Sequence, residues 1–504
     1  MGYLVGVDVG TTNTKAVLYD PEVGRVLAVA SRPTRVHHPG PGLTEHDPGE
    51  IWSAVVECIR EATAGRAAGV RAISSTSMAE AGVPIDRSGR YLYPIISWLD
   101  NRSAPQAERW REWLGPAEAF RITGQTIQAK FSINKLMWLR ENEPAVIDKL
   151  HKWLCMEDFV LYKLSGVDAI DYSLASRTFA FDQRSLAWSP RMLDLAGFSV
   201  DVFPRAYPSG TAVGEVTPAA AAETGLPVGA VVATGGHDHL CGSLAAGVVG
   251  PGALLDSMGT AESGLLLSDR YDPDPRLLEA GYCHYAHVIP GCYVTLFGLM
   301  GGGVLDWLVQ RFWPEAKAPG PVRSRCFDEA LALAAEVPPG ASGLVWLPHL
   351  GGGRTDQSDE QPRAALVGLT TALDRGHIVR ALLESLCYWL RGKLETMAAI
   401  APIGPTITAI GGGARSTLWM QIKADVTDRE VRVPLVSEST ALGAALLAGV
   451  GAGVFATTAE AAASVSRPTT VYYPDPARVA VYDRLYEQFR YLHPRVAAIT
   501  AEMG

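Results

Sequence analysis

The chain has 504 residues, of which 48% are hydrophobic and 19% charged, the composition of an ordinary globular protein rather than a collagen-like or disordered one. This length exceeds what one hydrophobic core usually supports, so we expect two domains, residues 1–244 and 245–504. The net charge of -9 comes without a run of basic residues, which argues against nucleic acid or an anionic membrane as the main partner.

The cysteines and the first residues of the sequence indicate in which cellular compartment the protein functions. Seven scattered cysteines with no CxxC pair predict neither a disulfide framework nor a zinc site. The opening MGYLVGVDVG lacks the basic start and cleavage site of a signal peptide, and no uninterrupted apolar stretch reaches the ~18 residues of a membrane span. We therefore expect a cytoplasmic protein.

The N-terminal segment alternates short β-rich runs with turn residues. We expect antiparallel strands at residues 3–8, 15–20 and 26–31, followed by a helix that is capped by Asp47 and begins at Pro48. Residues 70–75 then read as a buried strand. The stretch 105–196 is rich in helix formers, with helical spacing at 133–143 and 156–164, and predicts a helical insertion on the first domain.

Two later strands flank the expected crossing between the domains, near residue 245. A strand at 230–234 leads into Gly235-Gly236-His237-Asp238-His239, and a strand at 253–258 ends in Gly259-Thr260. The second half begins with strands and ends with glycine-bracketed helices, an order that echoes the first half. A faint duplication is a hint about the architecture only.

The segment GVDVGTTNTK, residues 6–15, has the composition of a phosphate-binding loop. A strand would deliver Asp8 to its end, glycine would let the backbone approach a ligand, and threonine hydroxyls and turn amides can hold phosphate oxygens. The same residues would also form a plain hairpin turn. This segment alone does not decide between the two interpretations.

Other glycine clusters offer a nucleotide site. No GxxxxGK[ST] sequence occurs, which excludes a P-loop, and no GxGxxG follows a strand in a convincing βαβ unit, which disfavours a dinucleotide fold. Instead, glycines gather at 259, at 301–303 before an apolar helix, and at 411–413 between a strand at 406–410 and a helix expected over 415–426. Amides at that helix N-terminus would face a nucleotide. Each cluster alone fits packing, but together with the Asp8 loop they favour a phosphate-and-nucleotide cleft.

Asp238 lies between two histidines at the end of a predicted buried strand. Side chains that alternate along a strand point to opposite faces, so joint metal chelation by His237, Asp238 and His239 is not expected. A single carboxylate facing the cleft suits a general base that accepts a hydroxyl proton during phosphoryl transfer.

At these residues the chain resembles the FGGY carbohydrate kinases, nearly from end to end. GVDVGTTNTKAVLYD is similar to the phosphate loop of that family, and AALVGLTTALDRGHIVRALLE at 364–384 fits its second motif. SINKLMWLREN at 132–142 matches the first motif, although Lys130 stands where the family has an aromatic or small residue. The resemblance implies an α/β protein with the two-domain actin-like (ribonuclease H-like) fold, each domain a mixed β-sheet flanked by helices, and an active site in the interdomain cleft.

The resemblance also implies roles around ATP and Mg²⁺. Asp8 and Asp238 would organise Mg²⁺, with Asp238 as the general base as well. The nucleotide and its phosphates would contact Gly10, Thr11, Thr12, Lys15, Gly259, Thr260, Gly302, Gly303 and Asp306, and the adenine would border Gly411, Gly412, Gly413 and Ser416.

For the substrate, the resemblance implies Met78, Ala79 and Glu80, where xylulokinases carry Met-His and glycerol kinases Arg-Glu. It also implies the Trp-x-Asp-x-Arg element of Trp98, Asp100 and Arg102, of which the charged pair could equally be a structural salt bridge. Lys130, His239, Glu262 and Ser263 would make the site more polar than glycerol requires. We expect a ketose such as xylulose or a related sugar alcohol.

The predicted activity is ATP-dependent phosphorylation of a hydroxyl of a sugar or polyol, with small molecules as partners and a homodimer as a family-level expectation. Two alternatives use the same fold: a sugar- or nucleotide-binding regulator without catalysis, and a chaperone-like or filament-forming ATPase. Retention of Asp8 and Asp238 argues against the regulator, and the motif at 364–384 with the Trp98 element argues against the second alternative.

Overall fold

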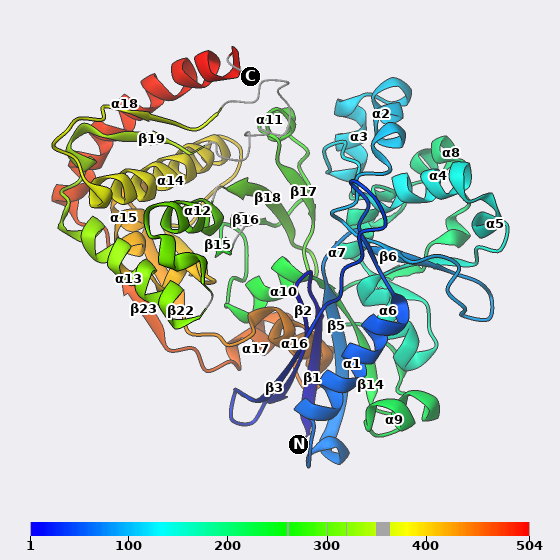
Figure 1. Cartoon of the computed structure of the whole chain (residues 1–504). Helices are drawn as coiled ribbons and strands as arrows, with labels where there is room; N and C mark the ends of the chain where they lie inside the picture. The colour runs from blue at the N-terminus through cyan, green and yellow to red at the C-terminus, as the bar shows by residue number, and fades with distance from the viewer. Residues whose placement is uncertain (1, 260–261, 300, 319, 349–362, 503–504) are drawn as a thin grey trace.

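The structure, a computed structural model, describes residues 2–259, 262–299, 301–318, 320–348 and 363–502. Two large mixed sheets lie in separate halves of the molecule, each with helices around it (Figure 1). The six-stranded sheet has the order β13-β14-β5-β1-β2-β3, and the seven-stranded sheet has the order β17-β18-β16-β15-β21-β22-β23. The predicted α/β class with two mixed sheets is therefore confirmed.

The first sheet begins with the predicted antiparallel meander, β1 (Tyr3–Val9), β2 (Asn13–Asp20) and β3 (Arg25–Pro33). Two buried strands, β5 (Val70–Ser77) and β14 (Val231–His237), extend it in parallel with β1, and β13 (Ala212–Glu215) closes its edge. Helix α1 (Pro48–Ala62) starts as predicted, because the Asp47 side chain accepts a hydrogen bond from the Glu50 amide.

The predicted insertion is mainly helical and is packed around aromatic side chains. Its helices are α2 (Ala104–Trp113), α3 (Pro116–Thr123), α4 (Ser132–Asn142), α5 (Pro144–Ile147), α6 (Met156–Ser165), α7 (Tyr172–Ala175) and α8 (Pro190–Ala196). A four-stranded sheet of β4 (Glu45–His46), β7 (Ile95–Ile96), β6 (Gly82–Ile85) and β8 (Lys152–Cys155) lies beside them. Short pairs join β9 (Ala169–Asp171) to β12 (Arg205–Tyr207) and β10 (Phe181–Asp182) to β11 (Ala187–Trp188), and α9 (Pro218–Thr224) follows.

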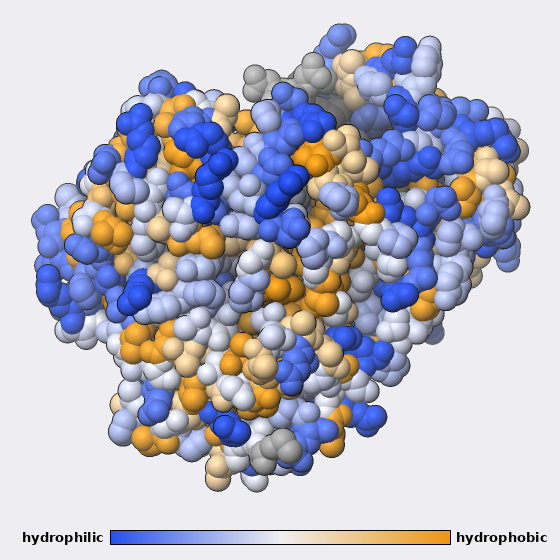
Figure 2. All heavy atoms as spheres, turned by 180° about the vertical axis from the view of Figure 1, so that it is seen from behind, coloured by the Kyte–Doolittle hydropathy of each residue, from blue (hydrophilic) through white to orange (hydrophobic). Residues whose placement is uncertain are grey.

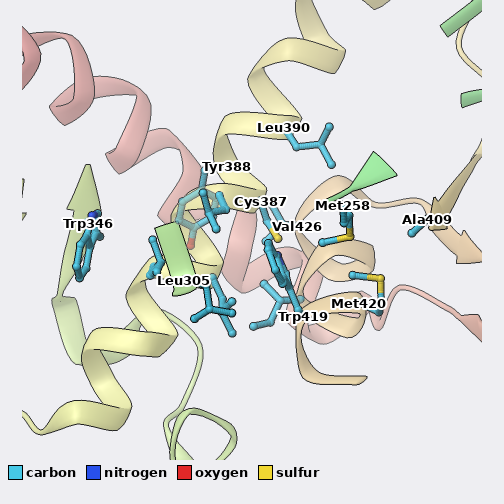
Figure 3. Packing of buried hydrophobic residues seen from close by; sticks show 14 of the residues in the cluster. Met258, Leu305, Trp346, Cys387, Tyr388, Leu390, Ala409, Trp419, Met420 and Val426 are labelled. Carbon is cyan, nitrogen blue, oxygen red and sulfur yellow. The ribbon is translucent and has the colours of Figure 1, made fainter. Parts of the chain in front are cut away.

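The second sheet consists of β15 (Leu254–Met258), β16 (Glu262–Ser268), β17 (Cys283–Ala286), β18 (Tyr293–Leu299), β21 (Thr406–Ile410), β22 (Glu430–Pro434) and β23 (Thr469–Tyr472). Its helices are α11 (Pro275–Glu279), α12 (Gly302–Phe312), α13 (Pro321–Glu336), α14 (Arg375–Ala398), α15 (Thr417–Thr427), α17 (Thr458–Ala463) and α18 (Pro476–Glu502), and β19 (Val345–Leu347) pairs with β20 (Ala365–Val367). Figure 3 shows part of the core of this half, where Met258, Trp419 and Met420 pack in one cluster.

Helices α10 (Asp238–Ala245) and α16 (Ser439–Gly451) lie between the two sheets (Figure 1). Their backbones approach closely, since a Cβ on Gly443 would lie 2.0 Å from the Cys241 carbonyl oxygen. A Cβ on Gly6 of β1 would likewise lie 1.9 Å from the carbonyl oxygen of Ala441. Helix α16 comes from the second half of the sequence but packs on the first sheet, so the two halves share one core. The division at residue 245, where α10 ends, stays a prediction.

The surface mixes polar and apolar residues. On the face opposite that of Figure 1, hydrophobic side chains are interspersed among hydrophilic ones (Figure 2). Among the described residues, no helix is both long and apolar enough to cross a bilayer.

Candidate active site

The Asp8 loop is the tip of the β1–β2 hairpin. Val9 pairs with Thr14 across the hairpin, and the Gly10 amide donates to the Asn13 carbonyl at 3.1 Å. Both sequence interpretations therefore remain compatible, because a hairpin turn can also present its amides and hydroxyls to phosphate. Thr12 at the tip is exposed.

Asp8 precedes this turn and carries a carboxylate that protein groups do not fully satisfy. Its Oδ1 is buried and makes no hydrogen bond within the part of the chain that the structure describes. Burial raises the pKa of Asp8 well above its ordinary value, and the negative charge of Asp238 raises it further, while Lys15 lowers it. The two predicted carboxylates are thus close enough to interact.

Asp238 starts a helix rather than ending a strand, which corrects the sequence-based expectation. Strand β14 continues to His237, and α10 begins at Asp238, whose Oδ1 accepts the His239 amide at 2.6 Å. The Asp238 carboxylate does not point to the face opposite the two histidines, because Nε2 of His237 and Nε2 of His239 lie 3.2 and 4.0 Å from that same oxygen. Burial lowers the pKa of His237 to about 3, so its ring is neutral at pH 7.

The predicted substrate segment lies directly beside the phosphate loop. The Met78 amide donates to the Val9 carbonyl at 3.0 Å, and Trp98 Nε1 donates to the Thr11 hydroxyl at 3.0 Å. Thr11 also lies 3.9 Å from the Met78 sulfur. Ala79 is buried next to Met78. The structure therefore brings the Trp98 element, the Met78 segment and the hairpin tip together.

Glu80 belongs to a buried ion cluster that the sequence did not reveal. It has a left-handed backbone (φ 66°), and its carboxylate accepts from Arg177 Nε at 2.8 Å, with Lys130 Nζ at 3.8 Å. Burial alone would raise the pKa of Glu80, but Arg177 and Lys130 outweigh it and lower the pKa. Arg177 was missed because it lies 97 residues from Glu80, and no motif marks it.

Arg177 connects this cluster to Asp238. Its guanidinium lies over the Phe131 ring at 5.3 Å and the Tyr285 ring at 5.2 Å. The Tyr285 hydroxyl lies 3.0 Å from His237 Nδ1, and His237 is next to Asp238. A continuous set of polar and aromatic side chains thus runs from Lys130 to Asp238.

Asp100 and Arg102 form a buried network of their own. They pair at 2.8 Å, and Arg102 also pairs with Glu45 at 2.7 Å and lies over the Trp138 ring at 4.9 Å. Their side chains are 0% and 2% exposed. Of the two interpretations, this geometry favours the structural salt bridge.

The glycine clusters of the second half converge on one strand end. The Gly302 amide donates to the Gly259 carbonyl at 3.2 Å. A Cβ on Gly411 (φ +95°) would lie 2.6 Å from the Met258 carbonyl oxygen, and one on Gly413 would lie 3.0 Å from both the Met258 side chain and Trp419. Gly303 follows in the first turn of α12, Gly412 is exposed, and Thr260 lies outside the described residues.

Helix α15 begins at Thr417 and not at 415, because residues 413–415 form a 3-10 turn. Ser416 is its N-cap and accepts a hydrogen bond from the Trp419 amide at 3.2 Å. One of the amides expected to face a nucleotide is therefore bonded within the protein.

Of four other predicted site residues, three form ion pairs within the protein and the fourth lies in a strand. Lys15 pairs with Glu438, the residue before α16, at 2.6 Å, and Asp306 pairs with Arg323 and accepts from Gln310 at 2.8 Å. Glu262 contacts Lys423 at 3.2 Å, and Ser263 pairs with Ser257 in the β15–β16 ladder. In the described chain the polar contacts of Glu262 are in the second half, away from Lys130 and His239.

Comparison with known proteins places the chain in a family. The model of the FGGY family of carbohydrate kinases, N-terminal domain, matches residues 3–245, and that of the C-terminal domain matches residues 257–452. The chain belongs to the FGGY family of carbohydrate kinases. As a member it is an ATP-dependent phosphotransferase with an alcohol group of a sugar or polyol as acceptor, so the predicted family and enzyme class are confirmed.

Relatives of this FGGY kinase span nearly its whole length. The xylulose kinase of Bacillus subtilis is 29% identical over 98% of this chain and 97% of its own, and the L-fuculokinase of Escherichia coli is 30% identical over 93% and 96%. The crystal structure of xylulose kinase from Rhodospirillum rubrum is 32% identical, with a TM-score of 0.88 over 98% of this chain and 99% of that one. This match confirms the predicted two-domain actin-like fold.

Proposed function

We propose that this FGGY kinase phosphorylates a ketose such as xylulose, or a related sugar alcohol, with Asp238 as the general base. The observation that carries the proposal is the convergence of Asp8, Asp238 and the Lys130–Glu80–Arg177 cluster beside the hairpin tip. The names of the xylulose kinases among its relatives support the substrate class.

Asp238 has the surroundings that a base for a hydroxyl requires. One of its oxygens is held by the His239 amide at 2.6 Å, which fixes the carboxylate, and its side chain is 26% exposed, so a substrate hydroxyl can reach it. Burial lowers the pKa of His237 to about 3, so this neighbour of Asp238 is neutral at pH 7. Phosphoryl transfer requires mainly alignment and charge neutralisation, for which one positioned carboxylate suffices.

Asp8 and Asp238 fit a hard divalent cation. The buried Asp8 Oδ1 has no hydrogen-bond donor in the described chain, and the negative charge of Asp238 raises the pKa of Asp8. Mg²⁺ is commonly bound by one or two carboxylates together with waters and substrate phosphates, and when bound it would neutralise charge on the transferred phosphate.

The sugar would lie against Met78, Ala79 and Trp98, with its hydroxyls toward Glu80, Lys130 and His239. Glu80 is already neutralised by Arg177, so Lys130 is a second cation beside one carboxylate. Lys130 is 27% exposed and can donate to an acceptor oxygen of the substrate. This excess of donors favours a substrate with several oxygens over glycerol.

The nucleotide would lie on the second half, with its phosphates toward Gly10, Thr11, Thr12 and Lys15 and toward Gly259, Gly302, Gly303 and Asp306, and its adenine near Gly411, Gly412, Gly413 and Ser416. In this arrangement residues 1–244 bind the sugar and residues 245–504 bind ATP. Closing the two halves together would exclude water from the transferred phosphate.

A coupled assay of ADP release across glycerol, ketoses, polyols and sugar acids tests the proposal. We expect four- to seven-carbon ketoses or sugar alcohols to give the highest kcat/KM, and ADP release without sugar to be weak. Faster turnover of glycerol than of all these sugars would refute the substrate assignment.

A further inference from the structure

Lys423 carries an ammonium group that is buried in the second half of the chain, and its side chain is 1% exposed. Helix α15 carries it two turns after Ser416, the N-cap of that helix. Its Nζ contacts the Asp256 carboxylate, the Met258 sulfur at 3.3 Å and the Glu262 carboxylate at 3.2 Å. Asp256 is the middle residue of β15, Met258 is the last residue of that strand, and Glu262 is the first residue of β16.

The contacts of Lys423 coincide with the point where the glycine clusters meet. Met258 and Glu262 are opposite each other in the β15–β16 ladder, and Gly259 follows Met258 directly. The backbone at Gly411 and Gly413 abuts Met258, and a Cβ on Gly301 would lie 2.4 Å from the Cβ of Glu262. Any shift of these two strand ends would therefore be transmitted to each glycine segment.

Stability alone gives little reason to bury this group. Taking an ammonium and two carboxylates out of water is costly, and apolar replacements of buried ion pairs are often equally stable. Two acceptor atoms of the cluster, Asp256 Oδ1 and Glu262 Oε2, also make no hydrogen bond in the described chain. Such a cluster gives direction and fixed spacing to the elements that it joins.

We propose that Lys423 is a positioning residue for the nucleotide: it joins α15 to the ends of β15 and β16, and so fixes the glycine segments against which the ATP phosphates and adenine bind. The inference rests on the proposed nucleotide site. Burial and the charge of Asp256 raise the pKa of Glu262 well above its ordinary value, and Lys423 opposes that rise. Glu262 is a hydrogen-bonding partner of Lys423, at 3.2 Å.

The proposal assigns Glu262 to the nucleotide side instead of the sugar side. The test is steady-state kinetics in both substrates with Lys423→Met, together with direct binding of a fluorescent ADP. We expect the KM for ATP and the Kd for the ADP probe to rise about 10-fold or more, with the KM for the sugar nearly unchanged. A matched control is Arg380→Met, which removes another buried cation of this half, bonded to Glu384 at 2.7 Å and Tyr482 at 2.6 Å.

Both variants should lose stability, but only Lys423→Met should weaken nucleotide binding. Equal nucleotide affinities of Lys423→Met and wild type would overturn the inference, as would an equal loss in Arg380→Met. If wild type itself binds no ADP probe, the proposed function fails instead.

A second pair of variants covers the case in which Lys423→Met does not fold. Glu262→Gln keeps the shape and a hydrogen-bond acceptor, whereas Glu262→Ala removes the contact with Lys423. We expect the first to bind nucleotide nearly as wild type does and the second to show the raised KM for ATP. A change in the sugar KM of Glu262→Ala, with an unchanged ATP KM, would return Glu262 to the sugar site and overturn the proposal.

Discussion

The sharpest test of the catalytic assignment is Asp238→Asn. Asparagine has the same shape, and its Oδ1 can still accept the His239 amide that Asp238 accepts at 2.6 Å, so α10 should start unchanged. What disappears is the negative charge and the affinity for the substrate proton. Loss of a general base costs about 10²- to 10⁴-fold in rate, or about 2.7 to 5.4 kcal/mol in the barrier.

The assay is ADP release at saturating ATP and sugar, with ADP binding measured separately by calorimetry. We expect kcat to fall by that factor while ADP binding and the melting temperature stay close to those of wild type. Asp47→Asn is the matched control, because the Asp47 carboxylate likewise accepts a backbone amide at a helix start, that of Glu50 at 2.9 Å, but belongs to α1. A kcat for Asp238→Asn within about threefold of wild type would refute the role of this residue.

Three further substitutions test the Lys130–Glu80–Arg177 cluster and the packing of α10 against α16. Lys130→Met should raise the sugar KM about 10-fold, the cost of one hydrogen bond to a charged group, and leave the KM for ATP unchanged; an unaltered sugar KM would remove Lys130 from the site. Arg177→Met should cost about 3–5 kcal/mol of unfolding free energy at pH 7, because it leaves Glu80 buried without its partner. Arg177 and Lys130 lower the pKa of Glu80, so the Glu80–Arg177 pair stabilises the fold above the ordinary glutamate pKa and loses that effect as pH falls through the lowered pKa. In denaturant titrations, the difference in unfolding free energy between Arg177→Met and wild type should therefore shrink below about pH 4. A difference that stays constant with pH would contradict this account. Gly443→Ala should lower the unfolding free energy by about 3 kcal/mol, because the added Cβ would meet the Cys241 backbone. In the control Gly298→Ala, the added Cβ meets nothing within 4 Å, and the change should be nearly neutral. Equal melting temperatures of the two variants would contradict the close packing of α10 and α16.

The fold was predictable where the pattern is local. Alternating apolar residues place β1 and β5 to within two residues at each end, and Asp47 followed by Pro48 marks the start of α1. Local reasoning was wrong at Asp238, where the strand gives way to a helix one residue earlier than the periodicity indicates and turns both histidines toward the same carboxylate.

The site was predictable only in part, because several of its contacts join distant residues. The pairs Glu80–Arg177, Glu262–Lys423 and Lys15–Glu438 are separated by 97, 161 and 423 positions, and nothing near Arg177, Lys423 or Glu438 in the sequence marks them. Polar side chains such as Asp100 and Arg102 look alike in sequence whether they are buried or exposed, and only the fold shows that they satisfy each other.

Helix α10 is short, and that shortness has a mechanical consequence. Asp238 stands at its first residue and Ala245 at its last, so the carboxylate lies only about 10 Å from the end of the helix near which the chain passes from one half to the other. In a rigid-body rotation, the displacement of each atom is proportional to its distance from the rotation axis. If the two halves rotate about that connection, residues far from it would move much farther than Asp238, so the proposed ATP site would move toward a proposed base that stays nearly in place.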